Sequence, residues 1–356
     1  MTSIVGTMSG TSADGIDMAE LETDGIHVAR FGAADTTPYS AKTRRSVLDA
    51  IAAGALDRFA WPEIAKAVTQ DHATALEGFI VKHGLAPDLV VFHGQTVWHD
   101  PDKGETVQLG NPQVLANRLK LPVVGDVRLA DMKAGGQGAP LVPVFHRALA
   151  NDLPQPVCFL NIGGVSNLTY LNGEGILAFD IGPGNALLDD WIRLNGAGDI
   201  DLDGAISSKG MPNADRVSAA LNHPFFALPG PKSLDRNAFS MSVAQGLSLE
   251  DGAATLVAFT AEAIARAARL CPQEPKLWII CGGGRLNPTL MKALSVRLAG
   301  DVKASEAFDI DGSALEAQAM AFLGARLQAG LPTSYPQTTG AKTPVVGGQL
   351  YLPVSG

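Results

Sequence analysis

Three glycine-rich segments carry residue types that bind phosphate. The first, residues 6–17, reads Gly-Thr-Met-Ser-Gly-Thr-Ser-Ala-Asp-Gly-Ile-Asp. Its glycines let backbone amides approach a phosphate closely, its hydroxyls add donors, and Asp14 could hold a hydrated Mg²⁺. It is not a Walker A motif, because no Gly-Lys-Ser/Thr follows. The alternative is a glycine-rich hairpin in which Asp14 only satisfies turn amides.

The second and third segments add a carboxylate and a flat turn. Residues 179–185 read Phe-Asp-Ile-Gly-Pro-Gly-Asn after an apolar run. Asp180 can act there as a general base or support a metal, and the helix that follows favours phosphate. Asp180 as a mere helix cap is the alternative. Residues 281–287 read Cys-Gly-Gly-Gly-Arg-Leu-Asn, and their glycines could pack under a purine, although such a run alone is weak evidence.

The elements that must position these segments follow from apolar periodicity. The chain opens with a pattern typical of an antiparallel meander, and the pattern restarts at residue 156, which indicates an architectural duplication. We expect strands at 88–92, 157–160, 166–171, 176–179 and 277–281, and helices at 41–53, 62–83, 185–195, 252–270, 288–298 and 313–328.

The loop at residues 133–138 is the predicted domain boundary. Gly135, Gly136 and Gly138 lower the cost of a hinge there. We therefore expect one domain from residues 1–133 plus 331–356 and a second from residues 134–330. The tail after Gly330, rich in Pro, Thr and Gly, is expected to be a strap on the first domain.

Composition excludes several classes of protein. The 356 residues carry a net charge of −9, which disfavours nucleic acid as a partner. The three cysteines are scattered without metal-type spacing, which fits a reducing cytoplasm. The N-terminus lacks a charged secretory region, and no apolar run is long enough to cross a membrane. We expect a cytoplasmic protein with no membrane partner.

Seven motifs, in order along nearly the whole chain, resemble the anhydro-N-acetylmuramic acid kinase family of the actin, sugar kinase and heat-shock chaperone superfamily. They are Gly10-Thr-Ser-Ala-Asp-Gly-Ile-Asp17, His93-Gly-Gln-Thr96, Gly125-Asp-Val-Arg128, Gly135-Gly-Gln-Gly-Ala-Pro-Leu-Val-Pro143, Asn161-Ile-Gly-Gly-Val-Ser-Asn167, Phe179-Asp-Ile-Gly-Pro-Gly-Asn185 and Cys281-Gly-Gly-Gly284. Val127 departs from the usual Phe, and residues 231–236 only approximate a Lys-Ser-Thr-Gly-Arg stretch. The roles of Lys232 and Arg236 therefore stay open.

The resemblance implies an α/β fold of two actin-like, ribonuclease H-like domains, with mixed sheets flanked by helices and a central cleft. The first domain would carry one phosphate loop, and the second would carry the other loop and the adenosine site. The implied cofactors are ATP and Mg²⁺, with Asp14 at the metal. The implied cofactor-binding residues are Gly10, Thr11, Ser12, Ala13, Asp14, Gly15, Ile16, Asp17, Asn161, Gly163, Gly164, Gly182, Gly184, Gly282, Gly283, Gly284 and Asn287.

The implied activity is an ATP-dependent kinase that opens the 1,6-anhydro ring of 1,6-anhydro-N-acetylmuramic acid with water and phosphorylates O6. The product would be N-acetylmuramic acid 6-phosphate, in peptidoglycan recycling. Inverting glycosidases need two carboxylates. Here the phosphoryl group takes the place of the proton on the leaving oxygen, so Asp180 alone would serve as base. Alternatives are another carbohydrate kinase of the superfamily and an actin-like ATPase switch.

The implied sugar-binding residues are His93, Gln95, Thr96, Arg128 and Glu316. Arg128 offers paired donors to the lactyl carboxylate of the sugar. A salt bridge from Arg128 to Asp126 or Asp131 is the alternative. His93 follows an apolar strand and also fits a hydrogen-bonded structural histidine, and Glu316 also fits a solvated helix face. Besides the sugar and ATP, a second copy in a homodimer is the possible partner.

Overall fold

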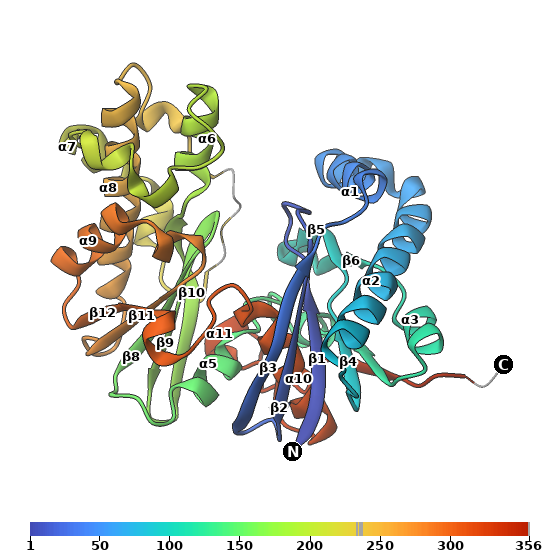
Figure 1. The fold of residues 1–356 in the computed structure, drawn as a ribbon. Helices are drawn as coiled ribbons and strands as arrows, with labels where there is room; N and C mark the ends of the chain where they lie inside the picture. The colour runs from blue at the N-terminus through green and yellow to red at the C-terminus, as the bar shows by residue number, and fades with distance from the viewer. Residues whose placement is uncertain (233, 235–237, 355–356) are drawn as a thin grey trace. The chain divides into compact units, whose positions relative to one another are not determined.

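The chain folds into two compact α/β units, and one of them uses both ends of the chain. The computed structural model describes residues 1–232, 234 and 238–354. Unit 1 comprises Met1–Leu149 and Ala314–Gly356, and unit 2 comprises Ala150–Ser313 (Figure 1). Arg236 lies outside the described residues, so its role stays open.

Unit 1 contains a six-stranded mixed sheet in the order β13-β7-β4-β1-β2-β3. Its strands are β1 (Thr2–Met8), β2 (Ile16–Thr23), β3 (Val28–Thr37), β4 (Leu89–Phe92), β7 (Val123–Gly125) and β13 (Gln349–Tyr351). A separate hairpin is formed by β5 (Gln95–Asp100) and β6 (Glu105–Leu109). The first three strands are antiparallel, whereas β4 is parallel to β1 and β7 is parallel to β4. The expected opening meander is therefore confirmed.

Unit 2 repeats this arrangement with a five-stranded sheet in the order β10-β9-β8-β11-β12. Its strands are β8 (Val157–Ile162), β9 (Val165–Asn172), β10 (Gly175–Pro183), β11 (Leu277–Cys281) and β12 (Asp301–Ala304). Again three antiparallel strands come first, followed by two parallel additions beside the first strand. The shared strand order confirms the architectural duplication and the predicted mixed-sheet α/β fold.

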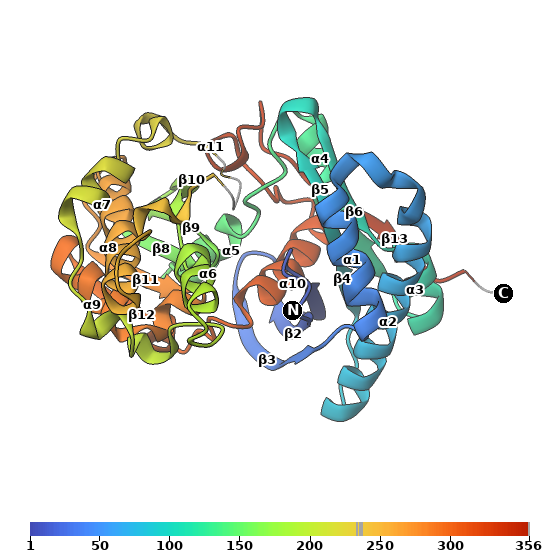
Figure 2. The same cartoon turned by 90° about the horizontal axis from the view of Figure 1, so that it is seen from above.

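Helices cover both faces of the unit 1 sheet. They are α1 (Ala41–Ala53), α2 (Trp61–His83), α3 (Pro112–Leu119), α4 (Leu129–Lys133), α5 (Pro143–Leu149), α10 (Leu315–Gln328) and α11 (Pro336–Thr339), with 3₁₀ turns η1 (Gly54–Ala60) and η2 (Pro101–Lys103). Figure 2 shows α1 and α2 on one side of the sheet and α10 on the other. Successive β1 residues point to opposite faces, so Val5 joins the core beneath α2 whereas Gly6 faces α10.

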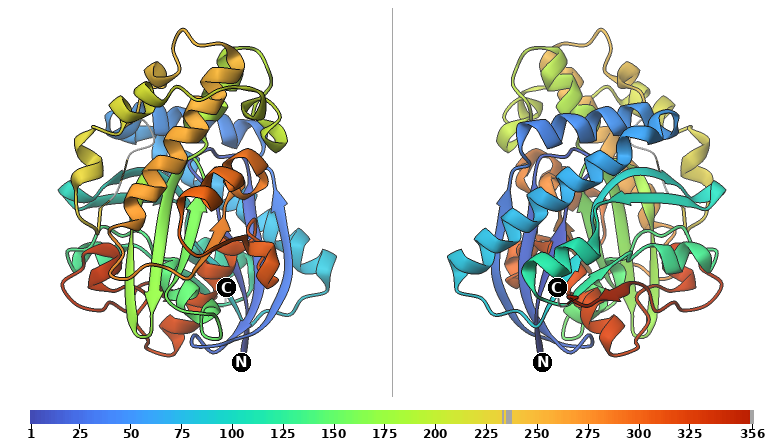
Figure 3. Two further views of the ribbon diagram at one scale, coloured as in Figure 1. Left: turned by 90° about the vertical axis from the view of Figure 1, so that its left-hand side faces the viewer. Right: turned by 90° about the vertical axis from the view of Figure 1, so that its right-hand side faces the viewer.

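The core of unit 2 lies between its sheet and α8, and the left view of Figure 3 shows α8 in front of the strands. The helices are α6 (Ala186–Leu194), α7 (Ala214–Ala220), α8 (Leu249–Ala268) and α9 (Pro288–Arg297), with 3₁₀ turns η3 (Leu202–Gly204), η4 (Ser207–Lys209), η5 (Pro224–Ala227), η6 (Met241–Val243), η7 (Gly283–Leu286) and η8 (Ser305–Phe308). Small residues let α8 pack closely, since Ala253, Ala261 and Ala263 are fully buried. None of the helices in the described part of the chain is long and apolar enough to cross a membrane.

The boundaries between the units differ from those predicted. Residues 134–149 and 314–330 pack with unit 1 instead of unit 2. The reason is packing between distant segments: Phe145 and Phe322 have ring centroids 5.3 Å apart, and a β-carbon at Gly6 would lie 2.0 Å from the Ala317 carbonyl oxygen. That close approach requires glycine at position 6 and fixes α10 on the unit 1 sheet.

The glycine loop after α4 is packed inside unit 1 and is not a boundary between units. The Gly136 amide donates to the Asp131 carbonyl at 2.9 Å, and the Gly138 amide donates to Asp131 Oδ2 at 2.7 Å. A β-carbon on Gly136 would lie 2.2 Å from Asp131 Oδ2. The boundary between the units therefore lies elsewhere, and these glycines make close contact with a buried carboxylate.

Candidate active site

The first glycine segment is an exposed loop between β1 and β2. Gly10, Thr11, Ser12 and Asp14 are exposed, and a β-carbon on Gly10 would meet nothing closer than 3.7 Å. Ala13, Gly15 and Ile16 are buried, and Ala13 and Ile16 belong to the core beneath α2. Of the predicted cofactor-binding residues in this loop, the exposed ones are free to reach a ligand and the buried ones anchor the loop.

A buried hydrogen-bond network holds the start of this loop. Gln95 is fully buried, and its Nε2 donates to the Gly10 carbonyl at 3.0 Å. The Tyr39 hydroxyl donates to Gln95 Oε1 at 3.2 Å and lies 3.0 Å from Ser9 Oγ. Gln95 was predicted to bind the sugar, but its amide is used by the protein. Ser9 belongs to the first glycine segment, whereas Tyr39 lies outside every motif, so the sequence does not reveal that the two side chains meet in this network.

Asp14, the predicted metal residue, is exposed and forms an ion pair with Arg44 of α1. Arg44 Nη2 donates to Asp14 Oδ1 at 2.9 Å. No cluster of three or more His, Cys, Asp or Glu side chains suited to a metal occurs among the described residues. A metal at Asp14 would therefore need most of its ligands from water and from a nucleotide.

Arg128 is held from two sides at the end of β7. Its Nε donates to His93 Nε2 at 2.9 Å, and its Nη1 donates to the Gly138 carbonyl at 2.7 Å. His93 Nδ1 lies 2.8 Å from the Gly94 carbonyl, so Nδ1 carries the proton and Nε2 accepts. Burial lowers the pKa of His93 to about 3, and the charge on Arg128 adds to this effect. The structural interpretation of His93 therefore accounts for both ring nitrogens.

Of the unit 1 carboxylates predicted to bind a ligand, only Glu316 acts electrostatically on Arg128 among the described residues. Glu316, in the first turn of α10, is exposed although the residues beside it are buried. Burial lowers the pKa of Arg128, and the charge on Glu316 opposes this shift. Asp17 at the start of β2 accepts a hydrogen bond of 2.6 Å from Thr36.

Thr96 is half-buried, and its Oγ1 accepts from Gln108 at 3.1 Å. The suggested salt bridge from Arg128 to Asp126 or Asp131 does not form among the described residues.

The second and third glycine segments meet in unit 2 at the ends of β8, β10 and β11. A β-carbon on Gly184 would lie 2.2 Å from the Gly163 carbonyl oxygen, and one on Gly282 would lie 2.4 Å from Asn161 Oδ1. A β-carbon on Gly284 would lie 2.5 Å from the side chain of Ile162. Only glycine permits these approaches, so the predicted cofactor-binding residues in unit 2 converge on one corner of the sheet.

The loops at this corner of the sheet have different roles: some residues support the turn and others are exposed. The amides of Gly184 and Asn185 donate to the carbonyls of Gly164 and Gly163, at 3.0 and 2.7 Å. The end of β10, Gly182 included, is buried and supports the turn between β8 and β9. Gly164 and Gly283 are exposed and are the residues open to a ligand.

The third segment is held by two side chains that point back into unit 2. Arg285 Nη1 donates to the Gly282 carbonyl at 2.8 Å, and its Nε donates to Glu306 at 2.6 Å. Asn287 is buried and caps α9 by accepting from the Leu290 amide at 3.1 Å. Asn287 was predicted to contact the cofactor, whereas its side-chain oxygen is used as a helix cap. Arg285 was not predicted, although it follows the glycines directly.

Asp180 lies on β10 just before the bulge that precedes Gly182. Its Oδ2 accepts from the Leu234 amide at 2.7 Å, and its own amide donates to the Lys232 carbonyl at 2.9 Å. Burial raises the pKa of Asp180 from 3.8 to about 6, against the opposing effects of the Leu234 amide and the Lys232 charge. A carboxylate with this pKa can accept a proton near neutral pH.

Lys232 is buried in unit 2, although its sequence context left its role open. Its Nζ donates to the carbonyls of Phe225 and Leu228, each at 3.1 Å, and lies 4.4 Å from the centroid of the Phe225 ring. Burial lowers the pKa of Lys232, while the charge on Asp180 raises it. Lys232 thus supplies positive charge behind the candidate base.

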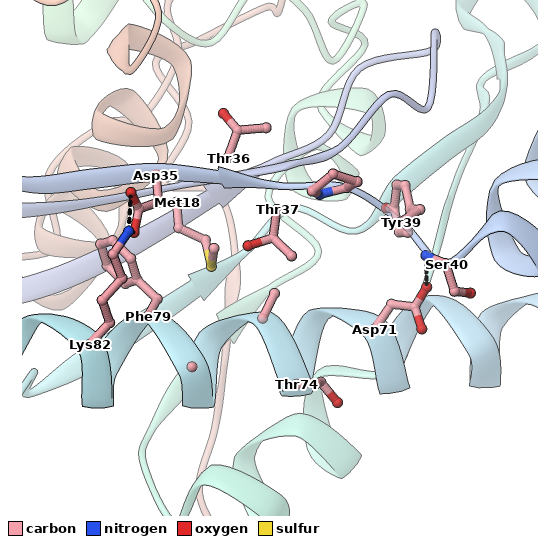
Figure 4. Close-up of a pocket in the computed structure, with 13 residues that line it drawn as sticks. Met18, Asp35, Thr36, Thr37, Tyr39, Ser40, Asp71, Thr74, Phe79 and Lys82 are labelled. Carbon is pink, nitrogen blue, oxygen red and sulfur yellow. Dashed lines mark hydrogen bonds and ion pairs between the residues drawn. The ribbon is translucent and has the colours of Figure 1, made fainter.

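A cavity of about 600 Å³ lies elsewhere in unit 1, between β3 and α2 (Figure 4). Two carboxylates line it, and both are occupied: Asp35 binds Lys82 at 2.8 Å, and Asp71 accepts from the Ser40 amide at 3.0 Å. None of the residues predicted for ATP or sugar lines this cavity. The candidate site residues of each unit therefore lie outside this cavity: the first glycine loop and Arg128 in unit 1, and the other glycine loops and Asp180 in unit 2.

Comparison with known proteins decides the family. Residues 2–353 match the anhydro-N-acetylmuramic acid kinase family. The chain belongs to this family. The anhydro-N-acetylmuramic acid kinase of Nitrobacter winogradskyi is 46% identical over 366 residues, covering 99% of this chain and 100% of the relative. That of Rhodospirillum rubrum is 48% identical over 353 residues, covering 98% and 93%. The chain is therefore a kinase.

A solved structure is similar at a lower level. A ROK family glucokinase from Streptomyces griseus, in complex with glucose and AMPPNP, is 15% identical, with 90% of this chain and 98% of that chain covered and a TM-score of 0.40.

Proposed function

We propose that this kinase phosphorylates O6 of 1,6-anhydro-N-acetylmuramic acid with ATP while water opens the anhydro ring. The product is N-acetylmuramic acid 6-phosphate, an intermediate of peptidoglycan recycling. The cytoplasm is the expected compartment, in keeping with free thiols at Cys158, Cys271 and Cys281. A homodimer stays a prediction.

The observation that carries this proposal is the state of Asp180. Ring opening requires removal of a proton from water, and an ordinary Asp with a pKa of 3.8 is a weak base. Burial raises the pKa of Asp180 to about 6, so the side chain remains ionised at neutral pH and accepts a proton more readily. The Leu234 amide fixes Oδ2, and among the described residues Oδ1 has no hydrogen-bond partner, so we propose that Oδ1 receives the proton from water.

The reaction balances with one carboxylate. Water adds its oxygen to the anomeric carbon, Asp180 takes the proton, and the bond from that carbon to O6 breaks. O6 attacks the γ-phosphorus of ATP, and ADP leaves. Phosphoryl transfer needs alignment and charge neutralisation more than further proton transfer.

The exposed loop residues support the binding of ATP. In unit 2, Gly164 and Gly283 are open to phosphate and base, and in unit 1, Gly10 and Thr11 are open to phosphate. Asp14 Oδ2 has no partner among the described residues and would be the protein ligand of a largely hydrated Mg²⁺, because one carboxylate is often enough to hold this ion. When bound, Mg²⁺ neutralises charge on the transferred phosphoryl group.

The sugar is proposed to bind on unit 1. Arg128 still has Nη2 without a protein partner among the described residues, and this nitrogen is suited to the lactyl carboxylate. Glu316 is exposed near Arg128 and suits a sugar hydroxyl. His93 and Gln95 are proposed to position Arg128 and Gly10 instead of touching the sugar.

Isotope labelling tests the proposal directly. Purified protein is mixed with ATP, Mg²⁺ and the anhydro sugar in H₂¹⁸O, with ordinary N-acetylmuramic acid as the control substrate. The expected product carries ¹⁸O at the anomeric carbon, and only the anhydro sugar is consumed well. A phosphorylated sugar without ¹⁸O would indicate another carbohydrate kinase. ADP formed equally well without sugar would indicate an ATPase switch.

A further inference from the structure

The orientation of Arg128 depends on Gly138, which is itself held in place. Arg128 Nη1 donates to the Gly138 carbonyl at 2.7 Å. Gly138 has a φ of +69°, and a β-carbon there would lie 2.9 Å from Met132 Sδ. A left-handed glycine of this kind can point its carbonyl where other residues cannot. The direction of the guanidinium is thus set on one side by a backbone group.

Asp131 supplies the contact that fixes Gly138. Its Oδ2 accepts from the Gly138 amide at 2.7 Å, and its side chain is 1% exposed. Arg128 and Asp131 do not bond directly; burial lowers the pKa of Arg128, and the charge of Asp131 opposes this shift. A buried carboxylate that accepts a backbone amide is a strong tether, because charge-assisted bonds exceed neutral ones.

The other oxygen of Asp131 binds the C-terminal tail. Oδ1 accepts from Thr339 Oγ1 at 2.6 Å and also from the Ser334 hydroxyl. The Gln137 amide donates to the Thr339 carbonyl at 2.7 Å. The Asp131 carboxylate therefore links the loop that orients Arg128 to a tail segment more than 200 positions further along the chain.

We propose that Asp131 is a positioning residue that aims Arg128 at the carboxylate of the sugar, acting through Gly138. This inference rests on the proposed function, in which Arg128 meets the lactyl carboxylate. Without the tether the Gly138 carbonyl is free to turn away, and the guanidinium keeps only its bond to His93. The protein would then lose affinity for the charged group of the sugar and would keep its affinity for ATP.

Two substitutions at position 131 separate positioning from general packing. Asp131→Ala removes the tether, and we expect the KM for the anhydro sugar to rise roughly tenfold to a hundredfold, as a misplaced binding group does. Asp131→Asn can aim its oxygen at the Gly138 amide and its NH₂ at the two hydroxyls, so it should retain most of the affinity. The KM for ATP should stay within about twofold in both variants.

A double-mutant cycle with Arg128→Lys is the deciding measurement. If Asp131 acts through Arg128, Asp131→Ala should add little to the sugar KM of Arg128→Lys. The preference for the anhydro sugar over 1,6-anhydro-N-acetylglucosamine, which lacks the lactyl group, should fall in both single variants. Additive losses, or an unchanged preference, would overturn the positioning role.

A second variant leaves Asp131 in place and tests the same role if Asp131→Ala fails to fold. Ser334→Ala combined with Thr339→Val loosens the other carboxylate oxygen, and a several-fold rise in sugar KM at constant ATP KM is expected. No change would also overturn the inference. Failure of the wild-type protein to consume the anhydro sugar would refute the proposed function, whereas additive losses in an active enzyme would refute the positioning role alone.

Discussion

Replacement of Asp180 by Asn should slow the reaction and stabilise unit 2 at the same time. The side chain keeps its shape and can still accept from the Leu234 amide, but it can no longer take a proton from water. We expect kcat to fall by a factor on the order of 10² to 10⁴, the usual contribution of a positioned general base. The KM for ATP should stay near that of the wild type.

The gain in stability follows from the pKa of the buried carboxyl. A group whose pKa is raised on folding contributes stability below its unfolded pKa and loses it as the pH rises through the folded value. For Asp180 this window runs from 3.8 to about 6. Each pH unit corresponds to 1.36 kcal/mol, so the ionised form costs about 3 kcal/mol at pH 8 and about half of that at pH 5. Asn avoids this cost at every pH.

Hydrogen exchange in peptides from β8 to β10 is the suitable assay, because a chain of two units need not unfold in one step. Protection from hydrogen exchange should be greater in Asp180→Asn than in wild type at pH 8. This difference in protection should become smaller toward pH 5. Asp199→Asn, an exposed carboxylate of the same unit, is the matched control and should change neither rate nor protection. Near-normal turnover of Asp180→Asn would refute its role as base, and a gap that does not depend on pH would refute the burial argument.

Three further outcomes are expected. Arg128→Lys should raise the KM for the anhydro sugar at least tenfold with little change for ATP, since an ammonium cannot replace a planar guanidinium; equal KM values would leave Arg128 a structural role. Gly184→Ala should reduce hydrogen-exchange protection in unit 2, because its β-carbon would lie 2.2 Å from the Gly163 oxygen. Gly10→Ala, whose β-carbon would meet nothing closer than 3.7 Å, should weaken ATP binding and leave protection in unit 1 unchanged. Weaker ATP binding in Gly184→Ala and lower stability in Gly10→Ala would contradict the roles given to the two loops. Asp14→Asn should raise the Mg²⁺ concentration for half-maximal rate several-fold, and an unchanged requirement would exclude Asp14 from the metal site.

Local signals explain why most elements could be predicted from the sequence. Helix α1 spans the predicted residues 41–53, and Ser40 caps it by accepting from the Thr43 amide. The meanders were visible as short apolar runs separated by turns. The glycine segments of unit 2 converge because β8 and β11 are parallel neighbours, so their carboxyl ends lie at the same end of the sheet.

Contacts between distant residues explain what could not be predicted. No local feature of α10 predicts that it packs on β1. The contact becomes evident only in the structure, where the missing side chain of Gly6 makes room for the backbone of α10. Gln95 carries a side chain that could bind a sugar, and nothing in the sequence reveals that Tyr39 and Gly10 occupy it. The ion-pair partner of Asp14 is Arg44 of α1, which lies 30 positions further along the chain. Such side-chain partners depend on the folded arrangement and have no periodic signature.

The discontinuous course of unit 1 has a consequence for the order of folding during synthesis. The ribosome releases β1 to β7 first, then all of unit 2, and only afterwards α10 and β13. Until then the face of β1 around Gly6 remains uncovered, and the β7 edge that later pairs with β13 stays open. Unit 2 can therefore be complete while unit 1 still awaits its last helix, so the N-terminal half is the part most exposed to aggregation or to chaperones in the nascent chain.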